Sequence, residues 1–335
     1  MFDVITVGSA LKDVYLRSSK FNIVKAKTVH GKAILMDFGT KIDIDHIVVE
    51  TGGGGTNTAV GFSRLGLKTA FFGKVGDDFD GKHILDVLRK EKVDTSLVKK
   101  SKNHITGYST IMESPSGERT ILVYRGANNF ISKSDLKLNK FKTRWVYISP
   151  LANKSVSMIR HIIKHAKDNN IYVALNPSKG LISLGLHNIH GILRHVDILI
   201  MNREEASLLT KISYKKDKAI FKRLIGYTNA IIVMTEGKNG TIVCDHTHTH
   251  KSNSPGVRVI NTVGAGDAFG CGFVTGIIEE SDIHHAIRLG TINAISVIQK
   301  LSAKEGLLRK RDLERHRRLW NKIKIKKIKI KKIKL

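Results

Sequence analysis

Residues 261–273 read NTVGAGDAFGCGF, a glycine-rich turn followed by a segment typical of a helix. The first backbone N–H groups of a helix have no acceptor within it, and the helix dipole favours negative charge there. Such a turn therefore predicts an anion-binding site. Asp267 lies inside this turn, where a carboxylate would repel a bound anion. Either no anion binds here, or the carboxylate takes part in chemistry beside it.

Seven short apolar runs, rich in β-branched residues, predict strands along the rest of the chain. They read DVITVGS, TAFFGKVG, RWVYISP, IYVALNP, VDILIMN, AIIVMTEG and TIVCD. Apolar residues at three-to-four spacing predict helices between them, over residues 58–65, 83–89, 155–166 and 204–209. Because strands that alternate with helices are typical of βαβ units, we expect an α/β fold, doubly wound around a mainly parallel sheet.

Two regions, about residues 15–49 and 101–124, break this rhythm. They contain alternating segments such as KIDIDHIVVE and TGYSTIMESPSGERTILVY, and alternation is typical of antiparallel strands with one wet face. The segment SPSGER predicts a hairpin turn. We therefore expect a small β-sheet lid beside the main sheet, of the kind that closes over a substrate and excludes water.

Length and composition exclude several classes of protein. A chain of 335 residues, 41% of them hydrophobic, can form one large domain or a domain with an insertion. No run of 18 apolar residues is present, and the N-terminus MFDVITVGSA lacks the pattern of a signal peptide, so we expect a cytoplasmic location. Neither Cys244 nor Cys271 belongs to a CxxC pair, and both are predicted to be buried thiols.

The formal net charge is +28, and residues 309–335 carry fourteen lysines and arginines against two acidic residues. The final KIKIKKIKIKKIKL fits neither the helical nor the strand period, so we expect residues 309–335 to form a basic helix end and a disordered lysine-rich tail. Binding of nucleic acid or an anionic membrane by this tail is an alternative function, since such binding releases counterions. A solvated surface is the simpler interpretation.

Several familiar sites are not supported by the sequence. The chain has no Walker A loop, and GAGDAFG comes after seven predicted strands instead of after the first, as a dinucleotide fingerprint would. The histidines of DHTHTH, residues 245–250, would share one face of a strand, but ligands of a zinc site usually come from separate elements. We therefore expect an exposed strand or loop end with solvated histidines, and no protein-held metal site.

Three further turns carry polar residues where a ligand could bind. TGGGGTNTAVGFSRLG, residues 51–66, places four glycines before a helix, and Asn57 is either a cap of that helix or a ligand contact. NREEA follows a predicted strand, and its Asn202 and Glu205 could also form a capping box. TEGKNG follows the next strand. Open α/β sheets bind ligands at such strand ends.

These motifs together indicate phosphoryl transfer without a P-loop, although each alone is weak. In this hypothesis Asp267 takes the proton of an attacking hydroxyl group. The backbone N–H groups of Gly264, Ala265 and Gly266 hold the charge that develops on the transferred phosphate.

The chain also resembles the ribokinase-like, PfkB-type carbohydrate and nucleoside kinases. TGGGGTNTAVGFSRLG with GKVGDDFDG resembles the N-terminal signature of that family, and NTVGAGDAFGCGF resembles its C-terminal signature. NREEA and TEGKNG lie between them in the family's order, so the resemblance covers about Asp3 to Leu308. It implies one kinase domain over residues 1–308, with a Rossmann-like sheet, a β-sheet lid that can pair two subunits, and use of ATP with Mg²⁺.

The resemblance also implies roles for individual residues. Asp267 resembles the catalytic base and Gly264 to Gly266 the anion hole. The other implied contacts are with the sugar for Asp13, Gly53 and Asn57, with magnesium and phosphate for Asn202 and Glu205, and with the nucleotide for Thr235, Gly237, Gly240 and Asn293. Asn293 would lie beside the adenine.

Departures from the family pattern bear on ions and substrate. Asn261 stands where the family commonly has Asp, and Ser302 with Ala303 replaces a Gly-Ala pair, both in loops that bind an activating potassium ion in ribokinase-type members. Potassium activation is therefore not expected. Gly54 replaces the lysine of ribokinases, and no acid follows RWVYISPLA, which weakens ribose as the acceptor. The acceptor we expect is a hydroxyl group of a small sugar, sugar acid or nucleoside.

Overall fold

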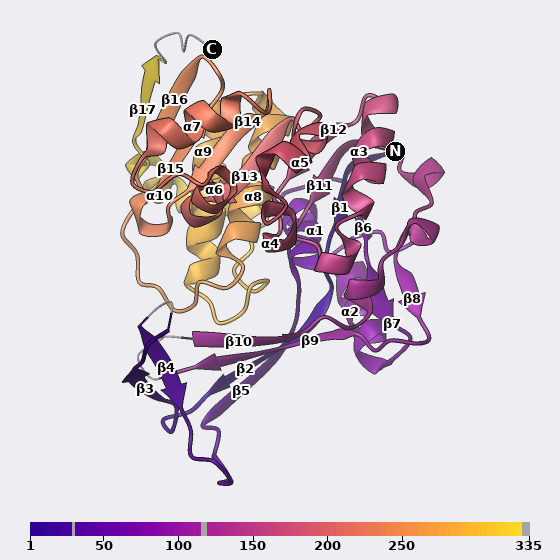
Figure 1. Ribbon diagram of the computed structural model, residues 1–335, viewed down its shortest axis with the longest axis vertical. Coiled ribbons are helices and arrows are strands. Elements are labelled where there is room, and N and C mark those ends of the chain that lie inside the picture. The colour runs from indigo at the N-terminus through magenta and orange to yellow at the C-terminus, as the bar shows by residue number, and fades with distance from the viewer. Residues whose placement is uncertain (29–30, 115–118, 330–335) are drawn as a thin grey trace.

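The computed structural model describes residues 1–28, 31–114 and 119–329. A nine-stranded sheet forms the centre of the large domain, in the order β17-β16-β15-β14-β13-β12-β11-β1-β6 (Figure 1). Its strands are β1 (Phe2–Val7), β6 (Thr69–Phe72), β11 (Thr143–Ile148), β12 (Tyr172–Leu175), β13 (Ile198–Asn202), β14 (Ile231–Thr235), β15 (Thr241–Cys244), β16 (His248–Ser252) and β17 (Ile325–Lys329). The pairs from β6 to β14 are parallel, and β15, β16 and β17 are added antiparallel. The prediction of an α/β fold around a mainly parallel sheet is confirmed.

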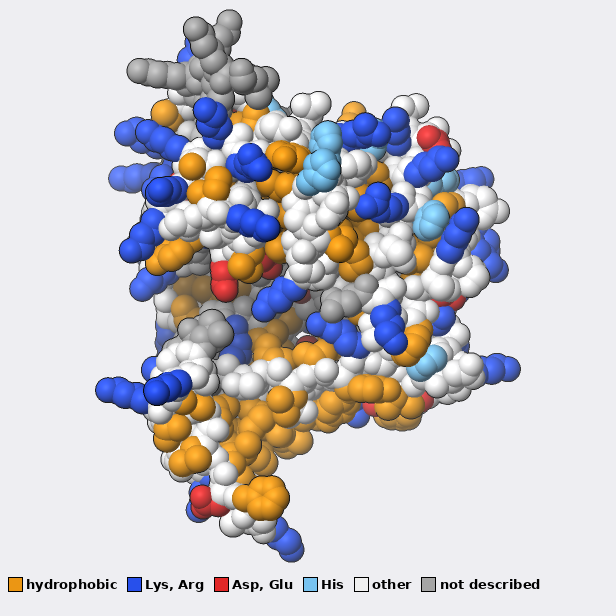
Figure 2. Space-filling model, viewed as in Figure 1, with side chains coloured by type: hydrophobic (Ala, Val, Ile, Leu, Met, Phe, Trp, Pro, Cys, Tyr) orange, Lys and Arg blue, Asp and Glu red, His pale blue; other side chains and the backbone are white. Residues whose placement is uncertain are grey.

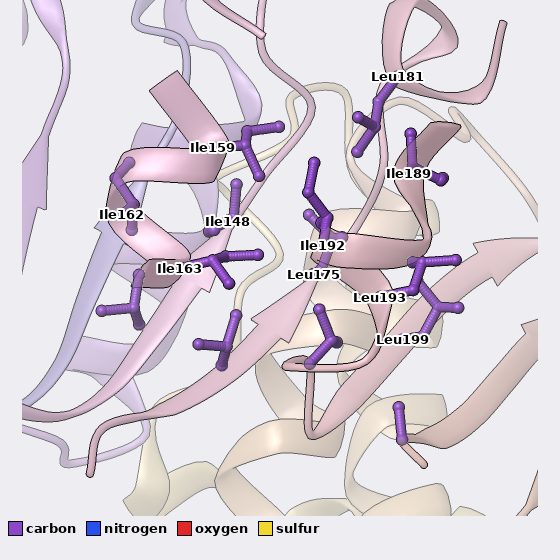
Figure 3. Packing of buried hydrophobic residues seen from close by; sticks show 14 of the residues in the cluster. Ile148, Ile159, Ile162, Ile163, Leu175, Leu181, Ile189, Ile192, Leu193 and Leu199 are labelled. Carbon is purple, nitrogen blue, oxygen red and sulfur yellow. The ribbon is translucent and has the colours of Figure 1, made fainter. Parts of the chain in front are cut away.

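Helices cover both faces of this sheet because successive side chains of a buried strand point to opposite faces. Ile5 packs into one apolar cluster and its neighbour Val4 into the other. The first cluster is completed by α3 (Met158–Asp168), α4 (Lys179–Ile182), α5 (Gly185–Leu193), α6 (Arg203–Thr210) and α7 (Asp217–Ile225), and Figure 3 shows its packing around Ile148, Ile162 and Leu199. The second is completed by α1 (Gly54–Arg64), α2 (Phe79–Lys90), α8 (Ala265–Glu280) and α9 (Ile283–Ile298).

A separate four-stranded sheet, in the order β10-β9-β2-β5, forms the lid below the large domain in Figure 1. Its strands are β2 (Leu11–Arg17), β5 (His46–Gly52), β9 (Gly107–Glu113) and β10 (Arg119–Tyr124). Two further pairs are β3 (Asn22–Lys25) with β4 (Lys32–Leu35), and β7 (Lys74–Gly76) with β8 (Lys99–Ser101). The first lid segment therefore runs from Leu11 to Gly52 and is longer than the predicted segment, about residues 15–49. The predicted hairpin turn lies mostly at residues 115–118, outside the described residues, between antiparallel β9 and β10.

The C-terminal segment corrects a prediction. Residues 309–329 were expected to continue into a disordered tail, but they form short helical turns, α10 (Arg317–Lys322) and β17, which pairs with β16. The edge of β16 offers unpaired backbone groups, and the isoleucines of the repeat supply apolar contacts, since Ile323 is buried in the second cluster and Ile325 packs against it. Residues 330–335 lie outside the described part of the chain.

Candidate active site

Most of the predicted site residues lie where the lid meets the carboxyl ends of the parallel strands. The N-terminus of α1 follows lid strand β5 directly, and its first turn is held against the end of β1 by a hydrogen bond from Gly55 N to Ser9 O of 3.1 Å. The N-terminus of α8 approaches the same place, because a Cβ atom at Gly54 would lie 3.2 Å from Asp267 Oδ1. Figure 2 shows the surface hollowed between the lid and the large domain.

Asp267 lies in the first turn of α8 and is partly exposed. Asn57 Nδ2 donates a hydrogen bond of 2.9 Å to Asp267 Oδ2, which joins two motifs that are 210 residues apart. Burial raises the pKa of Asp267, while the bond from Asn57 and the charge of Lys304 oppose that rise. The carboxylate therefore lies in a desolvated place with Oδ1 facing the glycine turn of α1, as a general base requires.

Gly264 caps the helix that carries Asp267 and needs to be glycine. Its φ is 80°, and a Cβ atom there would lie 2.5 Å from the Cβ atom of Ala303. Among the described residues, the backbone N–H groups of Gly264, Gly266 and Asp267 meet no acceptor, whereas that of Ala265 points to Thr262 O at 3.3 Å. The N–H groups of Gly264, Gly266 and Asp267 are therefore available to a bound anion, whereas the predicted contribution of Ala265 N–H is partly engaged within the turn.

Asp13 lies in lid strand β2, whereas the sequence suggested the end of the first strand. It is buried, and Ser109 Oγ donates to its Oδ1 at 2.8 Å. Burial raises the pKa of Asp13 as well. A side chain at Gly52 would collide with this carboxylate, so Gly52 makes room for it. Ser109 and Gly52 were both missed by sequence reasoning, although Gly52 belongs to the glycine run that was noticed.

Gly53 and Asn57 form the start of α1. Gly53 is the N-cap residue with φ of 94°, and Asn57 is buried in the first turn. The sequence left open whether Asn57 caps the helix, and it does not, because Gly53 occupies that position and the Asn57 side chain reaches Asp267 instead.

A cavity of about 460 Å³ adjoins the turn of Asp267. Thr235, Gly237 and Gly240 line one side of it, Ala265 and Gly266 another, and the apolar wall includes Phe269. Gly240 has φ of 95°, and a side chain there would collide with Ser252 O. A partly open cavity with apolar walls and a helix N-terminus at one end fits a base and the phosphates of a nucleotide.

Asn202 and Glu205 form a capping box at the start of α6 and do not line this cavity. Asn202 Oδ1 accepts from Glu205 N at 2.8 Å, and Asn202 N donates to Glu205 Oε2 at 2.9 Å. Asn202 stands beside Thr235 across β13 and β14, so the pair still lies at the sheet edge next to the cavity. Burial raises the pKa of Glu205.

The position of Asn293 differs from the expected one. This residue was expected beside the adenine, but its side chain is fully buried and does not line the cavity. Its Nδ2 donates to Ala268 O at 2.8 Å, and its Oδ1 accepts from Leu308 N at 2.9 Å. The amide therefore ties α8 and α9 to the C-terminal loop, while Thr291 and Ala294 of the same helix face the cavity.

Lys304 is a further polar residue at this site that the sequence did not reveal. Its side chain is buried between the start of α1 and the lid, and both Asp13 and Asp267 oppose the lowering of its pKa by burial. Only the tertiary structure could reveal it, since nothing in the local pattern LSAKEGLL distinguishes this lysine from a surface one.

The other predicted features lie away from the site. His250 is buried and contacts His284 Nε2 at 3.0 Å and Asp245 Oδ2 at 3.1 Å, so the expectation of solvated histidines is wrong for this residue. Within residues 1–28, 31–114 and 119–329, no group of three or more His, Cys, Asp or Glu side chains could hold a metal ion. Both cysteines are free and buried, as predicted. In the same part of the chain, no helix has the length and apolarity to cross a bilayer.

Asn261 and the loop around Ser302 contact each other directly. Asn261 Nδ2 donates to Leu301 O at 2.7 Å, and Asn261 Oδ1 accepts from Val263 N at 2.9 Å. The amide thus closes the glycine turn against the C-terminal loop.

Comparison with known proteins identifies the family of this chain. The family model described as pfkB family carbohydrate kinase matches residues 1–310. A 5-dehydro-2-deoxygluconokinase of Clostridium botulinum (strain Eklund 17B / Type B) is 30% identical over 323 residues, which cover 88% of this chain and 91% of the relative. A ribokinase of Haemophilus influenzae is 27% identical over 260 residues, 76% of this chain and 83% of the relative. The structure of Arabidopsis thaliana ribokinase with ribose and ATP superposes with a TM-score of 0.77 at 22% identity, covering 95% of this chain and 98% of that one. The chain therefore belongs to the pfkB family of carbohydrate kinases.

Proposed function

We propose that this protein transfers the γ-phosphoryl group of ATP to a hydroxyl group of a small sugar, sugar acid or nucleoside, with Asp267 as the general base. The observation that carries the proposal is the position of Asp267. Its carboxylate lies in a helix turn with free N–H groups, between the cavity lined by Thr235 and the buried Asp13 of the lid.

The chemistry follows from this placement. The acceptor hydroxyl oxygen attacks the γ-phosphorus, and its proton passes to Asp267 Oδ1, the oxygen that does not accept from Asn57. The bond between the γ-phosphorus and the β,γ-bridging oxygen breaks, and its electron pair leaves with ADP. The N–H groups of Gly264 and Gly266 stabilise the negative charge on the phosphoryl oxygens during transfer.

ATP would place its base against the apolar wall of the 460 Å³ cavity and its phosphates at the start of α8. The residues present fit a Mg²⁺ that is carried by the nucleotide, because the described residues offer no cluster of three ligands and Mg²⁺ is often bound through phosphates and waters. Glu205 and Asn202 are the polar groups next to the cavity that would orient its water shell. Magnesium would neutralise charge on the β- and γ-phosphates.

On the acceptor side, Asp13 is placed to accept from substrate hydroxyl groups, since Ser109 satisfies only its Oδ1. A carboxylate is an acceptor-only group and therefore selects hydroxyl donors. The relatives named above, a 5-dehydro-2-deoxygluconokinase and a ribokinase, support a small polyhydroxy acceptor. The glycine at position 54 and the absence of an acid after β11 favour acceptors other than ribose.

Asp267→Asn tests the mechanism. We expect kcat to fall by about 10²–10⁴-fold, the usual contribution of a general base, while the affinity for a non-hydrolysable ATP analogue, measured by calorimetry, stays unchanged. Turnover is measured by coupled ADP release with 5-dehydro-2-deoxygluconate, ribose and adenosine as acceptors. Glu280→Gln is the matched control, because it removes one carboxylate from the exposed end of the same helix. Wild-type turnover by Asp267→Asn would refute the assignment.

The basic C-terminal segment supports a second, weaker hypothesis, binding of nucleic acid or an anionic membrane. Lys326, Lys327 and Lys329 remain exposed on the edge strand β17, so the charge is available on a structured surface. Salt-dependent binding to DNA or anionic vesicles that is lost in a chain ending at Leu308 would support it.

A further inference from the structure

We propose that Lys304 is a positioning residue of the kinase site, whose ammonium group holds the Asn57 amide in the orientation that donates to Asp267. The same ammonium supplies the positive charge that lets the buried carboxylate of Asp13 and the partly exposed carboxylate of Asp267 coexist at this site. The proposal rests on the function proposed above and identifies a group outside the recognised motifs on which the base depends.

All three hydrogens of the Lys304 ammonium are engaged by the protein. Nζ donates to Thr51 O at 2.6 Å, to Thr56 Oγ1 at 2.9 Å and to Asn57 Oδ1 at 2.8 Å. An ammonium has three donors and no acceptor, so none remains for a substrate. The side chain is 5% exposed. Lys304 therefore acts on the reaction through other groups and does not itself bind the acceptor.

These contacts determine how the Asn57 amide is turned. An amide has one end that only accepts and one that only donates. Lys304 can only donate, so the carbonyl oxygen must face it, and the NH₂ group then points to Asp267 Oδ2 at 2.9 Å. In the reversed orientation the NH₂ group would face the ammonium and the oxygen would face the carboxylate. Lys304 thus leaves Asp267 Oδ1 as the oxygen available for the proton of the acceptor.

Lys304 also balances the charge of the site. Burial raises the pKa of Asp267 and of Asp13. The charge of Asp13 raises the pKa of Asp267 further, and the charge of Lys304 lowers the pKa of both carboxyl groups. Glu50 of β5 and Arg64 of α1 act on Lys304 from farther positions and with opposite signs. Tyr147 and Cys271 face Asp267 from β11 and α8, and burial raises the pKa of both, so they stay neutral.

The contact with Thr51 extends this role to the lid. Thr51 lies in β5, one residue before the end of that lid strand, and Thr56 and Asn57 lie in the first turn of α1. One ammonium group therefore joins the root of the lid, the helix that contacts the base and the C-terminal loop. The Thr56 hydroxyl oxygen accepts from Lys304, and its hydrogen is donated to Gly52 O at 2.7 Å. The hydroxyl group thus acts once as an acceptor and once as a donor, as its chemistry allows.

The test is the pH profile of kcat/KM between pH 5 and pH 10, with ATP and whichever of 5-dehydro-2-deoxygluconate, ribose and adenosine is phosphorylated fastest. Lys304→Met removes the charge and keeps most of the volume, so the acidic limb should move up by about 1–3 pH units. Below that limb kcat/KM should fall about tenfold for each unit. Lys304→Arg keeps the charge and should keep the acidic limb of the wild type, whatever its kcat. Lys300→Met is the matched control, because Lys300 precedes the same loop and forms an exposed ion pair with Glu305.

The wild-type protein provides a second measurement that does not require the neutral variant to fold. Burial lowers the pKa of Lys304 to about 8. Activity should therefore decline as the pH rises through that region, and Lys304→Arg, whose guanidinium stays charged, should remove this decline.

The outcomes separate this proposal from the kinase mechanism. The role of Lys304 is overturned by an acidic limb at the same pH in Lys304→Met and the wild type, or by an alkaline profile that Lys304→Arg leaves unchanged. Either result leaves the kinase mechanism in place as long as Asp267→Asn lowers kcat as expected. Undiminished turnover of Asp267→Asn instead overturns the mechanism on which the proposal rests.

Discussion

The turn that carries Asp267 offers a quantitative test of the structure through Gly264→Ala. The substitution has two separate costs. The φ of Gly264 is 80°, and a left-handed conformation costs an L-residue about 1–2 kcal/mol. The new Cβ atom would also lie 2.5 Å from the Cβ atom of Ala303, and such overpacking costs about 1–3 kcal/mol. Together the two effects should lower the free energy of unfolding by about 2–5 kcal/mol.

Urea unfolding followed by circular dichroism measures this difference. With an m-value of about 3 kcal/mol/M, the midpoint should fall by roughly 1 M. Gly266→Ala is the matched control, since a Cβ atom there meets nothing within 4 Å and its φ is not positive, so it should gain about 0.5–1 kcal/mol as an ordinary helical alanine. Adding Ala303→Gly to Gly264→Ala should remove the 2.5 Å contact and recover part of the steric cost, while the 3.0 Å approach to the Cα atom of residue 303 and the conformational cost remain. Equal midpoints for Gly264→Ala and Gly266→Ala would refute the reasoning.

Three further predictions concern pH, the C-terminus and the lid. Burial raises the pKa of Asp267 above 3.8, the ordinary pKa of an aspartate, so kcat/KM should already fall at pH values above 3.8 as the pH is lowered. A wild-type kcat/KM that stays constant down to pH 4 would contradict this expectation. A chain ending at Lys322 loses the buried Ile323 and should lose at least about 1.5–3 kcal/mol of stability in urea, whereas a chain ending at Lys329 keeps every described contact and should match the wild type. The lid exposes the apolar side chains of Ile47, Val49, Leu122 and Tyr124, so we expect the lids of two subunits to pair. Light scattering should show a dimer for the wild type and a monomer for Leu122→Lys. A monomeric wild type would contradict the pairing of lids.

The strands and the fold class follow from local patterns. Each of the seven apolar runs overlaps a strand of the structure. Six of the runs overlap parallel strands of the main sheet, which are buried on both faces and need continuous apolar residues, and TIVCD overlaps the antiparallel β15. TAFFGKVG is an instructive case, since it divides at Gly73 into β6 of the main sheet and β7 of a separate pair. Periodicity indicates that a segment is extended but does not state which neighbour it joins.

The C-terminal repeat shows the limit of local patterns. IKIKK favours neither a helix nor a strand by its own period, and a dense block of lysines predicts disorder. The structure provides a partner, the free edge of β16, and an apolar cluster that receives Ile323. Pairing and burial at a distant edge outweigh local charge repulsion, and no window of the sequence contains that information.

The motifs determined by themselves which residue types lie at the site: a carboxylate in a glycine turn, an amide after four glycines and polar groups at strand ends. The tertiary structure decided how they act together. It brought Asn57 to Asp267 and turned Asn293 into the protein interior. It also placed Lys304 between Asp13 and the pair formed by Asn57 and Asp267. Burial of an ammonium group is costly, but here the charges of two carboxylates and three hydrogen-bond acceptor oxygens compensate for it.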